Sequence, residues 1–297
     1  MEKQNSNKLI IFMYHGVVRY PLQVHDWCFI DESSFRYQIK YIIKHFEILP
    51  LIDAVERLKK GKIYRPTAAI TFDDGLQNNY DFAYPILREE ALPATLFLTT
   101  GLLNSDETLW YCRLNHALSI TNKNSIGWNG TSFDLTTPVS KAKSSSLIQK
   151  KLKDFPHPRL LIELRRILIE LGYDADCSIE VGSPYRMLNY QSINEMAFSG
   201  LIEFGAHTHS HAILSLISSK ERFDEIASSI RAITELTGRP CKVFAYPNGR
   251  LQDYDKEVIK ILYSFGVQLS VTAIEGVNYD MTPIIELRRY GIGQTSA

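Results

Sequence analysis

The stretch Ala69-Ile70-Thr71-Phe72-Asp73-Asp74-Gly75 is the part of the sequence from which the fold is best inferred. An apolar, β-branched run ends abruptly at two carboxylates and a glycine, which is typical of a buried strand whose carboxyl end opens onto a site. Because the chain turns there, Asp73 and Asp74 can reach one cavity from different directions. Taken alone, the heptapeptide is equally compatible with a plain strand followed by an Asp-Gly turn.

Length and charge narrow the class of protein. The 297 residues, 45% of them hydrophobic, can bury a large core in one enlarged domain or two. The 33 basic residues balance the 33 acidic ones, which argues against a general nucleic-acid binder. The composition does not indicate the oligomeric state.

Targeting signals are not evident in the sequence. No apolar run approaches the roughly 18 residues that a membrane span requires, and the N-terminal segment resembles no secretory signal. The four cysteines are widely spaced and form no Cys-x-x-Cys pair. We therefore expect a reduced, cytoplasmic protein without a membrane span, free in solution or at the inner face of a membrane.

Helical and buried-strand patterns alternate along most of the chain, which favours an α/β fold. The expected strands cover residues 8–14, 46–50, 69–72, 94–99, 202–206, 242–246, 268–273 and 286–292. The expected helices cover residues 34–45, 51–60, 79–90, 192–198, 218–236 and 254–265, the first with Ser33 or Ser34 as its N-cap.

The alternation breaks between residues 104 and 183. Apolar stripes predict helices at 110–118 and 158–171, whereas residues 121–146 are rich in Ser, Thr, Asn and Gly and are interpreted as a loop. We interpret residues 104–183 as a mainly helical insertion in a single catalytic domain that spans 1–297. Two roles are open for it, which are to cover the site and to stabilise the fold without a part in catalysis.

A histidine cluster follows the strand expected at 202–206. Within His207-Thr208-His209-Ser210-His211, the outer histidines are four residues apart, a spacing that places both rings on one side of a helical turn. Two imidazoles and a carboxylate are a common set of ligands for a divalent transition metal. Either Asp73 or Asp74 could supply the carboxylate, and chance clustering of histidines is the alternative.

Three signatures, in this order, resemble those of the polysaccharide deacetylases of carbohydrate esterase family 4. They are Thr71-Phe72-Asp73-Asp74-Gly75, His207-Thr208-x-x-His211 and Phe244-Ala245-Tyr246-Pro247-x-Gly249. The segments Met13-Tyr14-His15-Gly16-Val17 and Leu287-Arg288-Arg289-Tyr290 resemble the branch that includes poly-N-acetylglucosamine deacetylases. The resemblance implies a distorted (β/α)7-type barrel and hydrolysis of an N-acetyl group, less often an O-acetyl group, on a sugar. It also implies a bound divalent metal, Zn²⁺ first and Co²⁺, Ni²⁺ or Fe²⁺ as alternatives.

The resemblance also implies a role for each site residue. Asp74, His207 and His211 correspond to the metal ligands and Asp73 to the general base. This division agrees with the chemistry, since a metal polarises the carbonyl and acidifies a bound water while a carboxylate outside its ligand set removes the proton.

The third signature suggests a second source of oxyanion stabilisation. A backbone N–H of the loop at Tyr246, Pro247 and Asn248 could bind the oxyanion and contact the substrate. The alternative is a plain Pro-Asn-Gly turn.

Two departures from the family pattern lead to further hypotheses. Most members carry an acid histidine in a late strand, but no histidine follows His211 here. Ile11-x-Met13-x-His15 has the same form at the other end of the sequence, and the first and last strands of a barrel are neighbours, so we assign His15 as the general acid.

The second departure concerns an arginine. Ala245 stands where many members have an arginine, and we assign Arg289 as the group that orients Asp73. Structural roles are the alternative for both residues.

The sequence therefore predicts a metal-dependent deacetylase that acts on an N-acetylated glycan, oligosaccharide or sugar precursor. A substrate met inside the cell, such as a nucleotide- or lipid-linked sugar, fits the expected location. Trp110, Tyr111 and Tyr185 are weak candidates for a glycan groove. Two alternatives are kept, a hydrolase of small non-sugar amides or cyclic ureides and a non-catalytic glycan-binding relative.

Overall fold

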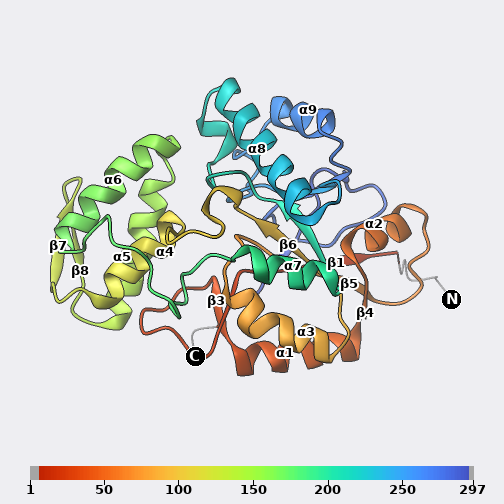
Figure 1. Ribbon diagram of the computed structural model, residues 1–297, viewed down its shortest axis with the longest axis horizontal. Coiled ribbons are helices and arrows are strands. Elements are labelled where there is room, and N and C mark those ends of the chain that lie inside the picture. Colours follow the sequence, from red (N-terminus) through yellow and green to blue (C-terminus); the bar gives the residue numbers. More distant parts are fainter. Residues whose placement is uncertain (1–6, 294–297) are drawn as a thin grey trace.

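A parallel sheet that curls toward a barrel forms the centre of the molecule (Figure 1). The computed structural model describes residues 7–293. The order of the strands along the sheet is β11 (Leu269–Val271), β10 (Val243–Ala245), β9 (Ile202–Ala206), β6 (Ala94–Leu98), β5 (Thr67–Phe72), β1 (Leu9–Tyr14) and β12 (Tyr290–Gly291), with β4 (Glu47–Ile48) beside the start of β5. The predicted barrel-like α/β fold is confirmed.

The segment from 284 to 292 brings the two ends of the sheet together. Leu287 forms a parallel bridge with Val271 of β11, and its carbonyl accepts a hydrogen bond from the Thr272 N–H at 2.8 Å. A few residues later, β12 pairs with Phe12 and Met13 of β1. The first and last strands are therefore neighbours.

Helices pack around the sheet close to their expected positions. They are α1 (Glu32–His45), α2 (Leu51–Lys59), α3 (Tyr84–Glu89), α7 (Tyr190–Phe198), α8 (Ser219–Thr237) and α9 (Lys256–Ser264). The expected helix at 79–90 begins instead with a π-helical turn, Asn79–Ala83. Within residues 7–293, no helix combines the length and apolar character needed to cross a membrane.

The expected N-cap of the first helix is wrong. Asp31 caps α1, and its carboxylate accepts hydrogen bonds from the N–H groups of Ser33 and Ser34 at 3.1 and 3.0 Å. The carboxylate lies two and three residues before these donors, which is the usual N-cap geometry, so the serines are inside the helix.

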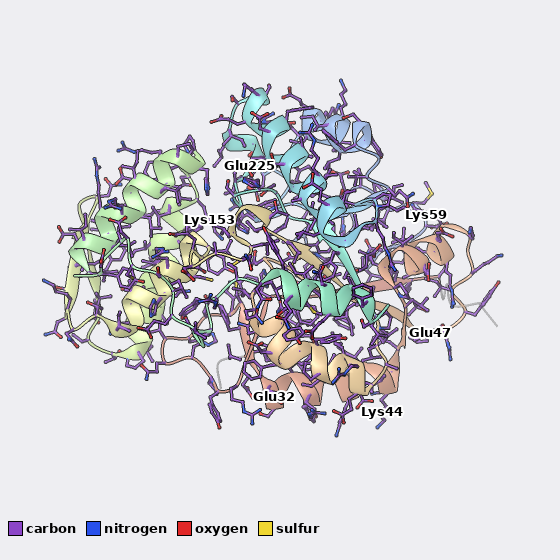
Figure 2. The ribbon with its side chains drawn as sticks, viewed as in Figure 1. Glu32, Lys44, Glu47, Lys59, Lys153 and Glu225 are labelled. Atoms are coloured by element: carbon purple, nitrogen blue, oxygen red, sulfur yellow. The ribbon has the colours of Figure 1, made fainter. Side chains whose placement is uncertain are left out.

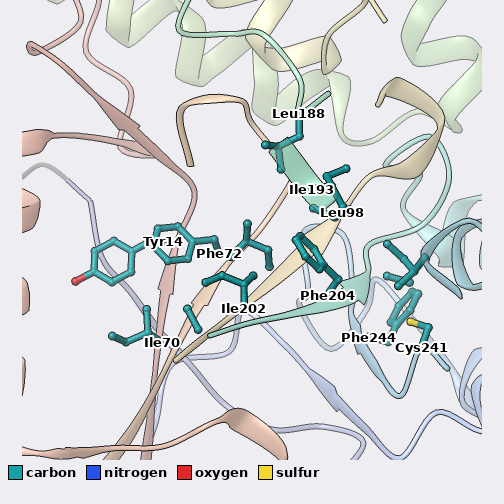
Figure 3. Close-up of a cluster of buried hydrophobic side chains, with 14 of the residues drawn as sticks. Tyr14, Ile70, Phe72, Leu98, Leu188, Ile193, Ile202, Phe204, Cys241 and Phe244 are labelled. Atoms are coloured by element: carbon teal, nitrogen blue, oxygen red, sulfur yellow. The ribbon is translucent and has the colours of Figure 1, made fainter. Parts of the chain in front are cut away.

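Strand β5 is buried on both faces, since all six of its residues are inaccessible. Phe72 at its end stacks on Tyr14 of β1, with ring centroids 5.4 Å apart, and both belong to the core between the sheet and its covering helices (Figure 3). Burial on both faces explains the near-continuous apolar run in the sequence.

The insertion forms its own lobe beside the barrel, drawn in yellow and green in Figure 1. It contains α4 (Trp110–Ile120), the antiparallel pair β7 (Ser125–Trp128) and β8 (Thr131–Asp134), α5 (Pro138–Leu152) and α6 (His157–Glu170). A hydrophobic cluster separate from the barrel core fills the lobe, with Leu114, Ile148 and Ile167 fully buried.

The expected loop at 121–146 is wrong, because these residues form β7, β8 and the first part of α5. Their polar side chains have hydrogen-bond partners inside the lobe. Asn129 and Gly130, with φ of 48° and 71°, make the tight turn that joins β7 to β8. Thr137 caps α5 by accepting a hydrogen bond from the Ser140 N–H. Buried Ser145 donates to the Asn115 side chain at 2.5 Å, which lets a serine-rich helix pack inside the lobe.

Candidate metal centre

A strained turn at the end of β5 separates the two carboxylates. Asp74 has φ of 79°, a backbone conformation that is rare outside glycine. Hydrogen bonds on both sides hold it, since the Asp73 N–H donates to the Tyr14 carbonyl at 2.9 Å and the Thr99 N–H donates to the Asp74 carbonyl at 3.2 Å. The segment between the insertion and α7 supports the same turn, because the Leu188 N–H donates to the Gly75 carbonyl at 2.9 Å.

The two outer histidines reach this turn from the loop that follows β9. The expectation of a helical turn is wrong, because residues 207–211 form a loop in which Thr208 and His211 have φ of 62° and 64°. The positive φ values, rather than helical periodicity, bring the rings of His207 and His211 together, with centroids 4.9 Å apart.

Glu225 of α8 holds the histidine loop in place, although no sequence motif pointed to it. Its carboxylate accepts the N–H groups of His209 and Ser210, both at 2.8 Å, and the Ser210 hydroxyl at 2.7 Å (Figure 2). The ring of His209 is exposed and contacts the Thr100 hydroxyl at 3.2 Å. The His209 ring therefore contacts Thr100 and not Asp74.

Asp74, His207 and His211 present three ligand atoms within 4.8 Å of one another. The Nε2 atoms of His207 and His211 lie 3.5 and 3.2 Å from Asp74 Oδ1. His207 Nδ1 lies 2.8 Å from the Ala245 carbonyl, so in the neutral ring the proton is on Nδ1 and Nε2 carries a lone pair.

This arrangement fits a cation. In the neutral state the His207 lone pair faces a carboxylate oxygen, which is also an acceptor, and Asp74 Oδ1 is buried without a hydrogen-bond partner among residues 7–293. Two facing acceptors in a buried site are unfavourable unless a positive charge lies between them. Imidazole and carboxylate donors together suit zinc and the neighbouring transition metals.

Tyr111 of the insertion occupies the other oxygen of the same carboxylate. Its hydroxyl donates to Asp74 Oδ2 at 2.5 Å, and both groups are buried. Burial alone would raise the pKa of Asp74, but hydrogen bonds and positive charge from the rings of His207 and His211, in their protonated form, hold that pKa well below its usual range. The sequence suggested Tyr111 only as a residue of a glycan groove, whereas the structure places its hydroxyl on Asp74, a candidate metal ligand.

Arg289 binds Asp73 in a bidentate pair. Its Nη1 and Nη2 donate to Asp73 Oδ1 and Oδ2, each at 2.7 Å, and its Nε donates to the Thr272 carbonyl at 2.7 Å. Both charged side chains are buried. Burial would raise the pKa of Asp73, but the positive charge of Arg289 keeps that pKa below its ordinary value, so Asp73 is ionised at neutral pH.

A cavity of about 90 Å³ opens beside these groups. The barrel contributes both aspartates, both ligand histidines and His15 to its wall, and the insertion contributes Trp110 and Tyr111 from α4 and Gln149 and Lys153 from α5 and its C-cap. The insertion therefore forms part of the cavity wall, and a covering role for it stays a prediction.

His15 lies at the cavity wall between β1 and β2 (Gly16–Val18). Its Nδ1 is buried without a hydrogen-bond partner in the described part of the chain. The edge of its ring meets the Trp27 ring, with centroids 5.1 Å apart. Packing against Trp27 thus holds the His15 ring, while its Nδ1 atom makes no hydrogen bond within the described residues.

The loop after β10 meets the cavity through Tyr246 and Asn248, whereas Pro247 is not part of the cavity wall. The Tyr246 hydroxyl donates to the Ile285 carbonyl at 3.0 Å, away from the site. The Gly249 N–H donates to the Pro247 carbonyl at 2.7 Å, and proline has no N–H. Among the described residues no backbone hydrogen bond engages the Asn248 N–H, which leaves it as the candidate oxyanion donor of this loop.

The structure is thus an α/β protein with a curled parallel sheet, which carries paired acids and a candidate metal site at its carboxyl edge. The sequence profile described as polysaccharide deacetylase matches residues 60–138 and 179–270, more than half of the chain. The chain belongs to the polysaccharide deacetylase family, and the predicted resemblance is confirmed.

The curated relatives of the chain match it over a shorter stretch than the family profile does. A poly-beta-1,6-N-acetyl-D-glucosamine N-deacetylase of Staphylococcus aureus strain N315 is 38% identical over 73 residues, which are 24% of this chain and 25% of the relative. The corresponding protein of Staphylococcus epidermidis is 34% identical over 77 residues, 26% of this chain and 27% of the relative. The aligned part thus spans about a quarter of each relative.

Two solved structures share the fold along nearly the whole chain. The Streptococcus pyogenes deacetylase PplD in complex with acetate has a TM-score of 0.62 at 17% identity, covering 96% of this chain and 92% of that one. IcaB from Ammonifex degensii has a TM-score of 0.62 at 19% identity, covering 96% and 91%. At these identities the likeness shows the fold.

Removing one ligand histidine should abolish tight metal binding. The variant His207→Ala should bind Zn²⁺ at least about 100-fold more weakly, because even the loss of an outer partner of a ligand typically costs ~10- to 100-fold. Calorimetric zinc titration of the chelator-treated protein measures this. His209→Ala, which removes an exposed imidazole two residues away, is the matched control, and equal zinc affinity in the two variants would contradict the site.

Arg289→Lys tests whether the guanidinium orients Asp73. Lysine keeps the positive charge but loses the two parallel hydrogen bonds, so we expect turnover to fall by about 10- to 100-fold while zinc content is unchanged. Turnover and bound zinc are measured on the same preparation. The neighbouring exposed residue provides the control Arg288→Lys. Wild-type turnover in Arg289→Lys would remove Arg289 from the site.

Proposed function

We propose that the protein hydrolyses the N-acetyl group of an N-acetylated sugar in a glycan, an oligosaccharide or a glycan precursor, and that the reaction depends on a divalent metal, zinc in the first instance. Membership of the polysaccharide deacetylase family supports the reaction type. The names of the staphylococcal relatives support an N-acetylglucosamine substrate, over the quarter of their length that aligns.

One observation carries the proposal. The neighbouring carboxylates have different partners, since Asp74 faces two imidazoles and Asp73 faces a guanidinium. A divalent cation held by Asp74, His207 and His211 would polarise the acetamide carbonyl and ease the loss of a proton from water. Asp73 stays outside that ligand set and is ionised, which is what a general base requires.

The remaining steps use residues around the cavity. Asp73 takes a proton from the attacking water, and Arg289 fixes the orientation of its carboxylate. The Asn248 N–H stabilises the negative charge that develops on the carbonyl oxygen. His15 gives a proton to the departing amine, a role supported by its place at the cavity wall and its unpartnered Nδ1.

The volume of the cavity is also compatible with the alternative function, hydrolysis of a small non-sugar amide or cyclic ureide. About 90 Å³ accommodates an acetamido group and part of a sugar ring, and it would also accommodate a small cyclic ureide or imide. The two functions differ in their products, because opening a cyclic ureide or imide releases no acetate.

Acetate release tests the proposed function directly. A panel of N-acetylated oligosaccharides and nucleotide- or lipid-linked sugars is incubated with chelator-treated protein before and after zinc is restored, and free acetate is measured. We expect acetate only with metal, and about 10²- to 10⁴-fold less with Asp73→Asn, which cannot accept the proton. The exposed Asp81→Asn is the control. Absence of acetate from the whole panel at full zinc occupancy would favour the small-amide alternative.

His15→Ala tests the assignment of the general acid. We expect turnover to fall by roughly 10²- to 10⁴-fold with unchanged zinc affinity, because the amine would leave without a positioned proton donor. A substrate whose leaving group needs no proton, such as an activated aryl acetate, should lose much less activity. His25→Ala removes an exposed imidazole and serves as the control. Near-normal turnover on the amide would refute the acid role.

A further inference from the structure

Lys153 is a residue of the cavity wall that the proposed mechanism does not use. It is the C-cap residue of α5, and Gln149 one turn earlier lines the same cavity. Figure 2 shows Lys153 where the lobe of the insertion meets the barrel. The insertion thus brings a cationic side chain to a site whose other charged groups come from the barrel.

The ammonium group of Lys153 has no counter-charge of its own. Within residues 7–293, no carboxylate lies within ion-pair distance of Lys153, and no hydrogen bond engages its side chain. Asp26 and Asp253 are the carboxylates whose charges favour its protonated form. Burial nevertheless lowers the pKa of Lys153.

Both of these carboxylates already have other partners. Asp26 accepts the Cys28 N–H at 3.0 Å and the Asn115 side chain. Asp253 accepts the Arg250 N–H and the Asn248 side chain, each at 2.7 Å, and it is paired with the Arg250 guanidinium at 3.1 Å. The charge of Asp253 is therefore shared with Arg250, whereas Asp26 has only neutral donors and acts on Lys153 from beyond ion-pair distance.

Other lysines of the same helix have structural tasks that Lys153 lacks. Lys141 donates to the Thr121 carbonyl at 2.9 Å, and Lys151 donates to the Thr131 hydroxyl at 2.7 Å, so both tie the lobe together. Lys150 is exposed to solvent. Lys153 differs in combining partial burial, a place at the cavity wall and the absence of a side-chain partner among the described residues.

We propose that Lys153 binds an anionic group of the substrate, a phosphate or a carboxylate carried close to the acetamido group. The inference rests on the proposed function and narrows its substrate class to anionic acetamido sugars. With a divalent cation bound, the charges of Asp73 and Asp74 are balanced, so they would not repel such a group. A lysine ammonium is a compact point charge that suits phosphate and carboxylate oxygens.

Binding of four simple sugars to the zinc-loaded protein tests the inference. The probes are N-acetylglucosamine, its 1-phosphate, its 6-phosphate and N-acetylmuramic acid, and dissociation constants are measured by NMR or calorimetric titration. We expect at least one anionic probe to bind about tenfold or more tightly than the neutral sugar, as a hydrogen bond to a charged group would give. The phosphates and the carboxylate compound identify which anion is preferred.

Variants at two positions of one helix separate this effect from direct binding of the anion to zinc. Lys153→Gln should lose the preference for the anionic probe, Lys153→Arg should keep part of it, and Lys150→Gln should behave as wild type. Equal zinc content and equal melting temperature establish that the variants are folded. A preference that survives in Lys153→Gln, or no preference in the wild type, would overturn the inference.

Acetate release from the same four probes distinguishes this inference from the proposed function. Acetate from the neutral sugar without a Lys153-dependent preference would contradict the inference alone. A Lys153-dependent preference in binding without acetate from any probe or from the panel above would contradict the proposed reaction and leave the anion site standing.

Discussion

The candidate site depends on keeping two adjacent carboxylates apart. Asp73 and Asp74 are consecutive, and two free carboxylates in one buried cavity would repel each other and raise the pKa of one of them. The left-handed backbone at Asp74 directs the second carboxylate to the histidines, and the first is held by Arg289. Each negative charge thus has its own positive or metal-binding partner, and the two can perform different tasks.

Local pattern was sufficient to predict the fold and to bring Asp73, Asp74, His207 and His211 together at one edge of the sheet. Buried strands that end in Asp-Asp-Gly and in the histidine cluster carry their signal within a few residues, and the signatures occur in the order of a known family. The serine-rich stretch at 121–146 was misread because composition does not show that Ser145 has a buried partner in Asn115, thirty residues away. The Asn129-Gly130 pair was a hairpin signal that could have been recognised.

Residues that act over long sequence distances were harder to find. Arg289 was suggested only by the absence of an arginine at Ala245, and its pairing with Asp73 joins positions 216 residues apart. Glu225 and Lys153 carry no motif, since a glutamate or lysine on an amphipathic helix is usually solvated. Their relation to the site arises from how α8 and α5 pack, which periodicity does not reveal.

The position of Arg289 links the site to the segment that closes the sheet. The segment that joins the two ends of the sheet also delivers the guanidinium to Asp73. A chain that ended before residue 289 would contain Asp74, His207 and His211 and yet leave the buried Asp73 carboxylate uncompensated, at a typical cost of about 3–5 kcal/mol. Such a truncated chain would therefore fold poorly, so the order of the site depends on a segment more than two hundred residues away in the sequence.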